Sequence, residues 1–188
     1  GDDLAVDVAI IGSGFAGSLT ALILRRLGRR VALLERGRHP RFAIGESTTP
    51  LTNLLIEELA DRYDLPDIRT FSKWGTWQRA HADVACGLKR GFTFVFHRDG
   101  EPFADDPSRN GQLMVAASPN DDVADTHWYR PDFDLALVEA ARGAGVVYLD
   151  DAHMADATPT ASGMTIDGTR GSRGFQIRAG FVIDASGP

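Results

Sequence analysis

The alternation of apolar and polar positions predicts three regular elements in the first 36 residues. Residues 6–12, "VDVAIIG", form a short, mostly apolar and β-branched run, typical of a strand buried on both faces of a parallel sheet. Apolar residues then recur at helical spacing as far as Leu27, and Gly28 can end that helix. Residues 30–35, "RVALLE", predict a second buried strand. The order strand, helix, strand indicates an α/β fold with a parallel sheet.

Three glycines lie at the predicted turn from strand to helix, in the pattern G-x-G-x-x-G. Gly12 permits a tight turn, Gly14 lets a pyrophosphate approach the backbone, and Gly17 lets helix and strand pack closely. The helix amino terminus then faces the phosphates with free N–H groups. Glu35 follows about 20 residues later, where a carboxylate can accept hydrogen bonds from a ribose. The pattern predicts dinucleotide binding, and the alternative is an α/β unit whose glycines serve packing alone.

The alternation is interrupted after this unit. Residues 36–50, "RGRHPRFAIGESTTP", precede an amphipathic helix at 51–65, which Thr49 and Pro50 can start. Such a loop is either a ligand-contacting segment or a solvent loop with ordinary Ser/Thr turn chemistry. Regular alternation also stops between 67 and 127, where residues 91–97, "GFTFVFH", and 112–118, "QLMVAAS", predict two further strands.

The segment "THWYRPDFDLALVEAARGAGVVYLD" predicts a short strand, a helix with Pro131 in its first turn, and another strand. The helix should bury one stripe of apolar residues. That stripe consists of Phe133, Leu137, Val138 and Ala141.

Composition narrows the class of protein. Apolar residues make up 43% of the chain and charged residues 24%, as in a soluble globular protein. The net charge of -6, without a basic run longer than a pair, argues against nucleic-acid binding. The single cysteine, Cys86, excludes an intrachain disulfide, and no apolar run approaches the roughly 20 residues that span a membrane. The five histidines show no metal spacing, so we expect no metal. The start, "GDDLAVDVAIIG", carries acids where a signal peptide would carry basic residues, so we expect a cytoplasmic location.

At "ERGRHPRFAIGESTTP" the chain resembles the flavin monooxygenase superfamily, which includes p-hydroxybenzoate hydroxylase, geranylgeranyl reductases and flavin-dependent halogenases. The GES-x-x-P form is most similar to the halogenase branch. "YRPDFDLAL" is similar to the family's V-x-R-x-x-F-D-x-x-L segment, and "RAGFVIDASGP" resembles its strand and turn that return to the dinucleotide. The resemblance implies a Rossmann-like FAD-binding domain at 1–188, a parallel sheet with helices on both faces, in which 67–127 is an inserted β-rich, substrate-side segment.

The resemblance also implies residue roles. Glu35 would hold the adenosine ribose, Arg36 would lie along the adenine, and the segment 44–48 would run beside the flavin. Arg130 would reach the FAD, or alternatively pair with Asp132 or Asp134. The implied cofactor-binding residues are Gly12, Gly14, Phe15, Ala16, Gly17, Glu35, Arg36, Ile44, Gly45, Glu46, Ser47, Thr48, Arg130 and Ala185.

Lys89, in "GLKRGFTFVF", is the candidate catalytic residue. Halogenases carry a lysine in a similar setting, K-x-G-x-T-F, between flavin and substrate. The resemblance implies that this amine holds hypohalous acid, or becomes a haloamine, and aims the halogen at an aromatic carbon. The alternative is that Lys89 and Arg90 form an exposed basic pair at a strand start.

We therefore expect an FAD-dependent oxidoreductase, in its sharpest form a halogenase of an electron-rich aromatic that uses reduced FAD, O₂ and halide, with a separate flavin reductase. The alternatives are a flavin hydroxylase, a geranylgeranyl-reductase-like flavoprotein, or a non-catalytic dinucleotide-binding regulatory module. The family's W-x-W-x-I-P and carboxyl-terminal G-D segment do not occur in these residues. We expect a further, carboxyl-terminal part of the same protein to supply them.

Overall fold

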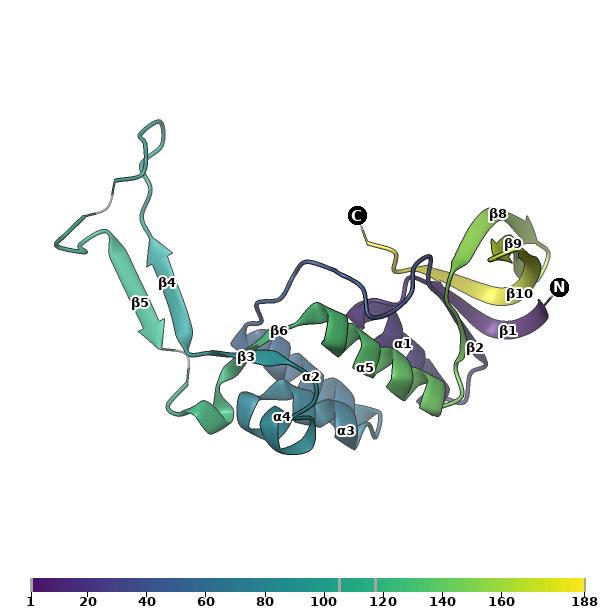
Figure 1. The fold of residues 1–188 in the computed structure, drawn as a ribbon, viewed down its shortest axis with the longest axis horizontal. Coiled ribbons are helices and arrows are strands. Elements are labelled where there is room, and N and C mark those ends of the chain that lie inside the picture. The colour runs from purple at the N-terminus through teal and green to yellow at the C-terminus, as the bar shows by residue number, and fades with distance from the viewer. Residues whose placement is uncertain (1, 105, 117, 188) are drawn as a thin grey trace. The chain divides into compact units, whose positions relative to one another are not determined.

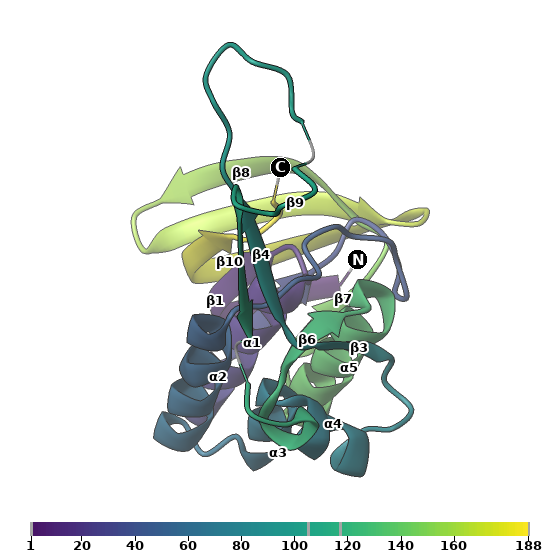
Figure 2. The same cartoon turned by 90° about the vertical axis from the view of Figure 1, so that its left-hand side faces the viewer.

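The computed structural model describes residues 2–104, 106–116 and 118–187. The chain forms two compact units, one of Gly1–Gly45 with Tyr129–Pro188 and one of Glu46–Trp128 (Figures 1 and 2). The two predicted strands on either side of the glycine turn therefore belong to the same unit as the carboxyl-terminal residues.

The first unit is built on a six-stranded sheet with the strand order β7-β2-β1-β10-β9-β8. Strand β1 is parallel to both β2 and β10, and β2 is parallel to β7. Strands β8, β9 and β10 pair in antiparallel fashion. The strands are β1 (Asp2–Ile11), β2 (Val31–Leu34), β7 (Val147–Leu149), β8 (Ala152–Thr160), β9 (Gly163–Arg170) and β10 (Arg173–Asp184). The parallel centre confirms the prediction of a Rossmann-like α/β fold.

Two helices accompany this sheet, α1 (Phe15–Arg26) and α5 (Arg130–Gly143). They pack against each other and so lie side by side on one face of the sheet (Figure 1). The sequence predicted helices on both faces of the sheet. Strands β8, β9 and β10 follow one another as antiparallel hairpins, and a hairpin connection contains no helix. The predicted buried stripe of α5 is confirmed. Gly28, with φ +75°, follows the end of α1, as expected of a helix-ending glycine.

The second unit combines short helices with two pairs of strands. Thr49 caps α2, because its side chain accepts a hydrogen bond from Thr52 N at 3.4 Å. Strand β3 pairs with β6, and β4 pairs with β5. The elements are α2 (Pro50–Arg62), α3 (Pro66–Arg69), η1 (Thr70–Ser72), α4 (Trp74–Ala80), β3 (Cys86–Lys89), β4 (Gly91–Val95), β5 (Gln112–Ala116), η2 (Asp121–Val123) and β6 (Asp125–Trp128). The unit extends beyond the expected 67–127 because α2 packs against α3 and η1.

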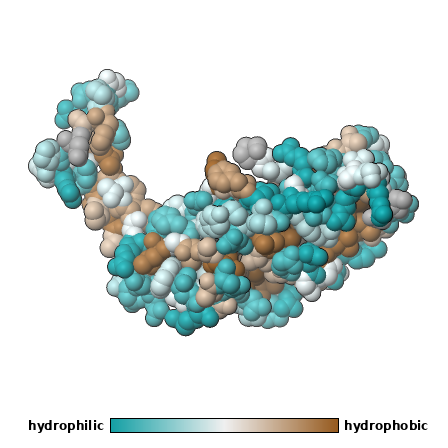
Figure 3. Space-filling model, in the orientation of Figure 1, coloured by the Kyte–Doolittle hydropathy of each residue, from teal (hydrophilic) through white to brown (hydrophobic). Residues whose placement is uncertain are grey.

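The hairpin of β4 and β5 differs from the rest of the second unit in its exposure. Phe94 is 57% exposed and Met114 is 73% exposed, although they lie on facing strands. Figure 3 shows apolar residues gathered along this hairpin. Trp77, in contrast, is fully buried and packs edge-on against Phe71, so it belongs to the core of the unit. In the part of the chain that the structure describes, no helix combines the length and the hydrophobicity that a membrane span needs.

Candidate functional site

The first candidate site lies where parallel strands of the first unit end. Gly12 follows β1, Glu35 follows β2 and Ala185 follows β10, and parallel strands place their carboxyl ends at the same edge. Backbone hydrogen bonds join these three segments directly. Gly12 N donates to Leu34 O at 2.8 Å, and Ala185 N donates to Ile11 O at 2.7 Å. The predicted return of residues 185–187 to the glycine turn is therefore present in the structure.

The three glycines of the turn have different surroundings. A Cβ on Gly12 would lie 2.4 Å from the Ala185 carbonyl oxygen, and a Cβ on Gly17 would lie 1.9 Å from the Gly12 carbonyl oxygen. Neither position can carry a side chain without moving the backbone. At Gly14 the nearest atom, Arg130 Nη2, would be 3.6 Å from a Cβ. The space above Gly14 is thus open to an approaching ligand.

The start of α1 supplies positive potential to this space. The first turn of a helix leaves backbone N–H groups without a partner inside the helix, and the first turn of α1 holds no acidic residue. The guanidinium groups of Arg130 and Arg41 flank the same point, at 3.6 Å and 3.8 Å from a Cβ on Gly14, and the Asp134 carboxylate that pairs with Arg130 lies at 3.9 Å. This combination suits the two negative charges of a pyrophosphate.

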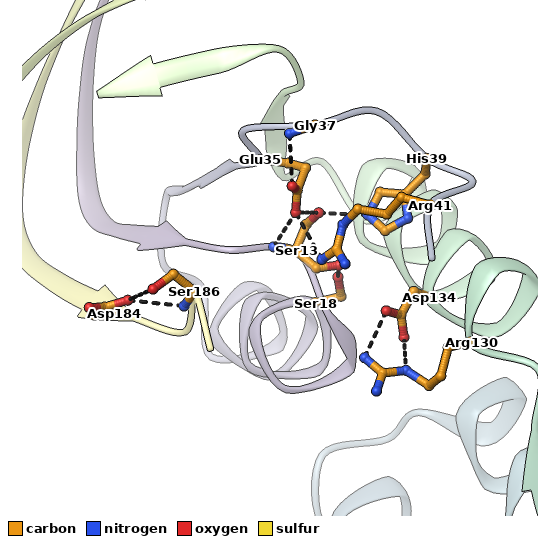
Figure 4. A network of polar contacts seen from close by, with 10 residues as sticks. All are labelled: Ser13, Ser18, Glu35, Gly37, His39, Arg41, Arg130, Asp134, Asp184 and Ser186. Carbon is orange, nitrogen blue, oxygen red and sulfur yellow. Dashed lines mark hydrogen bonds and ion pairs between the residues drawn. The ribbon is translucent and has the colours of Figure 1, made fainter. Parts of the chain in front are cut away.

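Glu35 is held in a dense hydrogen-bond network beside the glycine turn (Figure 4). Its Oε2 accepts from Ser13 N at 3.1 Å, Ser13 Oγ at 2.8 Å and Arg41 Nη2 at 3.1 Å, while Oε1 accepts from Gly37 N at 2.9 Å. Burial alone raises the pKa of Glu35, but the donors Gly37 and Ser13 and the charge of Arg41 outweigh it and lower the pKa to about 2. Oε1 accepts a single bond, so it can still accept a ribose hydroxyl.

Ser13, His39 and Arg41 were not identified from the sequence. Ser13 gives its single hydroxyl proton to Glu35, so the Nε2–H of His39 is assigned as the donor to Ser13 Oγ at 2.7 Å. Burial and the neighbouring charge of Arg41 lower the pKa of His39, which keeps the ring neutral. The basic composition of the loop 36–41 was the available signal for Arg41, and buried Ser13 gave none.

Arg130 is buried at the start of α5 and makes four hydrogen bonds (Figure 4). Its Nε and Nη2 bind the two oxygens of Asp134 at 2.8 Å each, and its Nη1 donates to Ile44 O at 2.7 Å and Gly45 O at 3.3 Å. The ion-pair alternative is confirmed with Asp134. Since Arg130 also holds the Ile44 and Gly45 carbonyls, it positions the first part of the segment expected beside the flavin.

These residues surround a cleft of about 1040 Å³. Ile44 and Phe42 lie at this cleft and are 77% and 79% exposed. Beyond the turn after β10, Ser186 N and Oγ both bind Asp184, which fixes that wall (Figure 4). The predicted cofactor residues that line the cleft are Gly12, Gly14, Phe15, Ala16, Glu35, Arg36, Ile44, Arg130 and Ala185. Open space at Gly14, the amino terminus of α1, two guanidinium groups and a Glu35 oxygen that accepts a single bond fit an adenine dinucleotide.

The second candidate site, in the second unit, is centred on Lys89. This side chain is 7% exposed, whereas Arg90 is exposed and pairs with Asp121 at 3.0 Å, so the reading of an exposed basic pair is wrong for Lys89. Lys89 Nζ donates to Ser47 Oγ at 2.6 Å and to the Thr48 carbonyl oxygen, and it lies 3.9 Å from the ring centroid of Phe92. Burial lowers the pKa of Lys89, and Asp125 opposes that change.

The residues that hold Lys89 are themselves fixed along β6. Ser47 forms a bridge with His127, and Thr48 Oγ1 donates to Thr126 O at 2.8 Å. Trp128 N donates to Glu46 O at 2.7 Å. The predicted Glu46, Ser47 and Thr48 therefore pair with β6 in the second unit, and two of them bind the predicted catalytic lysine. Their contact with the flavin stays a prediction.

No group of three or more potential metal ligands of the His, Cys, Asp and Glu types occurs among the residues that the structure describes.

Fold and cleft define a dinucleotide-binding protein, and the chain belongs to the FAD-dependent oxidoreductase family, whose model matches residues 7–188. Its cofactor is FAD, as the resemblance at "ERGRHPRFAIGESTTP" implied. The chain is 34% identical over 187 residues to tetracycline 7-halogenase of Kitasatospora aureofaciens, covering 98% of this chain and 32% of that protein. It is 34% identical over 182 residues to monodechloroaminopyrrolnitrin halogenase PrnC of Pseudomonas fluorescens, covering 97% and 31%.

A solved structure is similar as well. Halogenase PltM, in complex with phloroglucinol and FAD, is 29% identical with a TM-score of 0.80, over 96% of this chain and 34% of that chain. The resemblance to the halogenase branch is thereby confirmed. The chain spans about a third of the length of the curated relatives it matches.

Proposed function

We propose that this chain is the FAD-binding part of a flavin-dependent halogenase that acts on an electron-rich aromatic compound. Similarity to proteins that are named halogenases supports this proposal. The observation that carries it is the state of Lys89, a buried amine with no carboxylate at ion-pair distance among the described residues. Burying a charge without an ion pair is unfavourable, and such groups occur preferentially at functional sites.

FAD, once reduced and exposed to O₂, supplies the oxidising power that converts halide into hypohalous acid. The ammonium of Lys89 has three N–H donors, and the described residues accept two of them. The third N–H has no oxygen acceptor among the described residues, and it can exchange its contact with the Phe92 ring for a hydrogen bond to the oxygen of hypohalous acid, which weakens the oxygen–halogen bond. The halogen then bonds to the aromatic carbon, and the displaced ring proton joins the departing hydroxide as water.

Aromatic substrate, halide, O₂ and a separate flavin reductase are the partners that this proposal requires. Electron-rich aromatics are favoured because the halogen arrives as an electrophile. Phloroglucinol, the compound bound by the similar halogenase PltM, has this character. The reductase follows from the halogenase branch, in which reduced flavin is delivered by another protein.

The test is a Lys89→Ala variant of the full-length enzyme, supplied with reduced FAD, O₂, bromide and a panel of phenols and indoles. Removing a charged donor that acts in the transition state should lower brominated product by about 100-fold or more. FAD binding should persist, because Lys89 is not among the residues of the dinucleotide cleft. Products are followed by mass.

The matched control is Lys73→Ala, because Lys73 is the other lysine of this chain and is ion-paired with Glu57 at 2.8 Å. That variant should brominate at nearly the wild-type rate. Lys89→Ala with the same undiminished rate would remove this residue from the mechanism. Hydroxylated product from the wild type, under every halide, would show a flavin hydroxylase instead.

A further inference from the structure

A second buried charge lies opposite Lys89 on the neighbouring strand. Lys89 and Asp125 are direct partners in the antiparallel ladder of β3 and β6. Directly opposed residues project to the same face, with Cβ atoms roughly 5 Å apart. Asp125 is 3% exposed, so its carboxyl group is as buried as the amine that it faces.

The carboxyl group of Asp125 is fixed on one side and unpaired on the other. Asn53, on α2, donates from Nδ2 to Asp125 Oδ1 at 2.5 Å. Asp125 Oδ2 and Asn53 Oδ1 are buried and have no hydrogen-bond partner within the described part of the chain. A buried carboxylate with a single donor needs a nearby positive charge, and Lys89 supplies one.

Other titratable groups on the adjoining segments do not replace this pairing. Glu46 and His127 are exposed to solvent, and Arg90 is engaged with Asp121 at the surface. Cys86, on the same strand as Lys89, stays protonated because burial raises the pKa of its thiol. Asp125 is thus the carboxylate whose charge acts on Lys89.

We propose that Asp125, held by Asn53, is a positioning residue that supplies the countercharge for the Lys89 ammonium without occupying its remaining N–H. Asp125 forms no ion pair within 4.0 Å of Lys89, while Ser47, Thr48 and the Phe92 ring hold the amine in place. A direct Lys89–Asp125 contact would use the donor that hypohalous acid requires. An offset charge stabilises the ammonium through space and leaves that donor free. This role rests on the proposed function of Lys89.

The opposing effects on the two groups agree with this arrangement. Burial lowers the pKa of Lys89 and the charge of Asp125 raises it. Burial raises the pKa of Asp125, and the charge of Lys89 and the hydrogen bond from Asn53 lower it. Each charge therefore favours the ionised form of the other group, whereas burial favours the neutral form of both groups.

The experiment measures the ionisation of Lys89 directly, in the full-length protein and without turnover. Trace acetylation with acetic anhydride between pH 7 and pH 11, resolved by peptide mass spectrometry, follows the neutral amine. Asp125→Asn removes the countercharge at nearly constant shape, so the pKa of Lys89 should fall. At a fixed pH below that pKa, labelling should rise about threefold to tenfold, since the neutral fraction grows tenfold for each pH unit.

Lys73 provides the internal control. Its labelling should stay unchanged in Asp125→Asn, because its own countercharge is Glu57. Conversely, Glu57→Gln should alter labelling of Lys73 and leave Lys89 as in the wild type. An unchanged pH dependence of Lys89 in folded Asp125→Asn would overturn the proposal.

A second variant covers the case in which Asp125→Asn does not fold. Asn53→Ala keeps the carboxyl group but removes its hydrogen-bond donor, so Asp125 is charged for a smaller fraction of the time. Labelling of Lys89 should then rise in the same direction by a smaller factor, and no change would equally overturn the proposal. Because labelling needs no turnover, the result stays separate from the halogenation assay, which alone decides whether Lys89 is catalytic.

Discussion

Each of the two units buries a basic side chain, Arg130 in the first and Lys89 in the second, and the two charges have different partners. Arg130 binds both oxygens of Asp134 and two backbone carbonyls. Lys89 binds a hydroxyl group, one carbonyl and a ring face, and its carboxylate neighbour stays beyond ion-pair distance. A buried charge that is ion-paired with a protein carboxylate holds structure together. A buried charge with a donor to spare is prepared for a reactant.

The largest effect that we predict concerns the unit that holds Arg130. It tests whether the open space at Gly14 receives the pyrophosphate of FAD. The backbone at Gly14 is extended, with φ of -66°, and a Cβ there has no contact shorter than 3.6 Å. Gly14→Val should therefore leave the protein folded and abolish FAD binding, because the side chain fills the space that the pyrophosphate needs. The measurement is the flavin content and the FAD titration of the purified full-length variant.

Gly17→Val is the matched control, since its Cβ would lie 1.9 Å from the Gly12 carbonyl oxygen. This variant should fail to fold, with or without FAD. If Gly14→Val retains stoichiometric FAD, the glycine turn does not face the pyrophosphate.

A smaller but still large effect should separate the two buried cations by stability. Asp134→Ala leaves the Arg130 guanidinium buried without its countercharge and should cost about 3–5 kcal/mol in the free energy of unfolding. Lys89→Met keeps most of the volume but removes the offset countercharge of buried Asp125 and the donor to Ser47 and Thr48, so the expected loss is smaller, about 1–3 kcal/mol. Urea unfolding of both full-length variants decides the comparison, and equal losses would show that Lys89 is structural too.

The first unit was largely predictable from the sequence, because residues close together in the chain determine its strands, its helix and its glycine turn. Strand, glycine turn, helix and acid follow one another in 36 residues, and each glycine has a steric reason that is independent of distant parts. The stripe on α5 is equally local, since helical spacing alone identifies it. The roles of Ser13 and His39 could not be predicted from the sequence, because both residues act through hydrogen bonds that only the folded chain brings together around Glu35.

The second region was predictable only by resemblance. Lys89 was singled out by its neighbours in sequence, but nothing local distinguishes a buried lysine from an exposed one. Its burial depends on Ser47 and Thr48, which lie more than 40 positions away and reach it through pairing with β6. Asp125 and Asn53 were missed for the same reason, because a strand register and a helix face bring them together.

The smallest effect that we predict concerns Glu35. This buried carboxylate accepts hydrogen bonds from Ser13, Gly37 and Arg41, and its Oε1 can accept one more from the ribose. Its pKa of about 2 in the folded protein lies below the ordinary value of 4.5, so ionised Glu35 stabilises the fold above about pH 4.5. That contribution, at most about 3 kcal/mol, should disappear as the pH falls from 4.5 to 2. Glu35→Gln lacks it at every pH.

The urea midpoints of wild type and Glu35→Gln should therefore differ at pH 6 and converge toward pH 2. FAD affinity of the variant at pH 7 should be weaker by about 1–3 kcal/mol, the usual loss for a buried hydrogen-bonding partner. Midpoints that fall in parallel would show that Glu35 is not ionised through this network. Unchanged affinity together with converging midpoints would leave Glu35 as a structural anion like Asp134, and would move the ribose contact to another residue of the cleft.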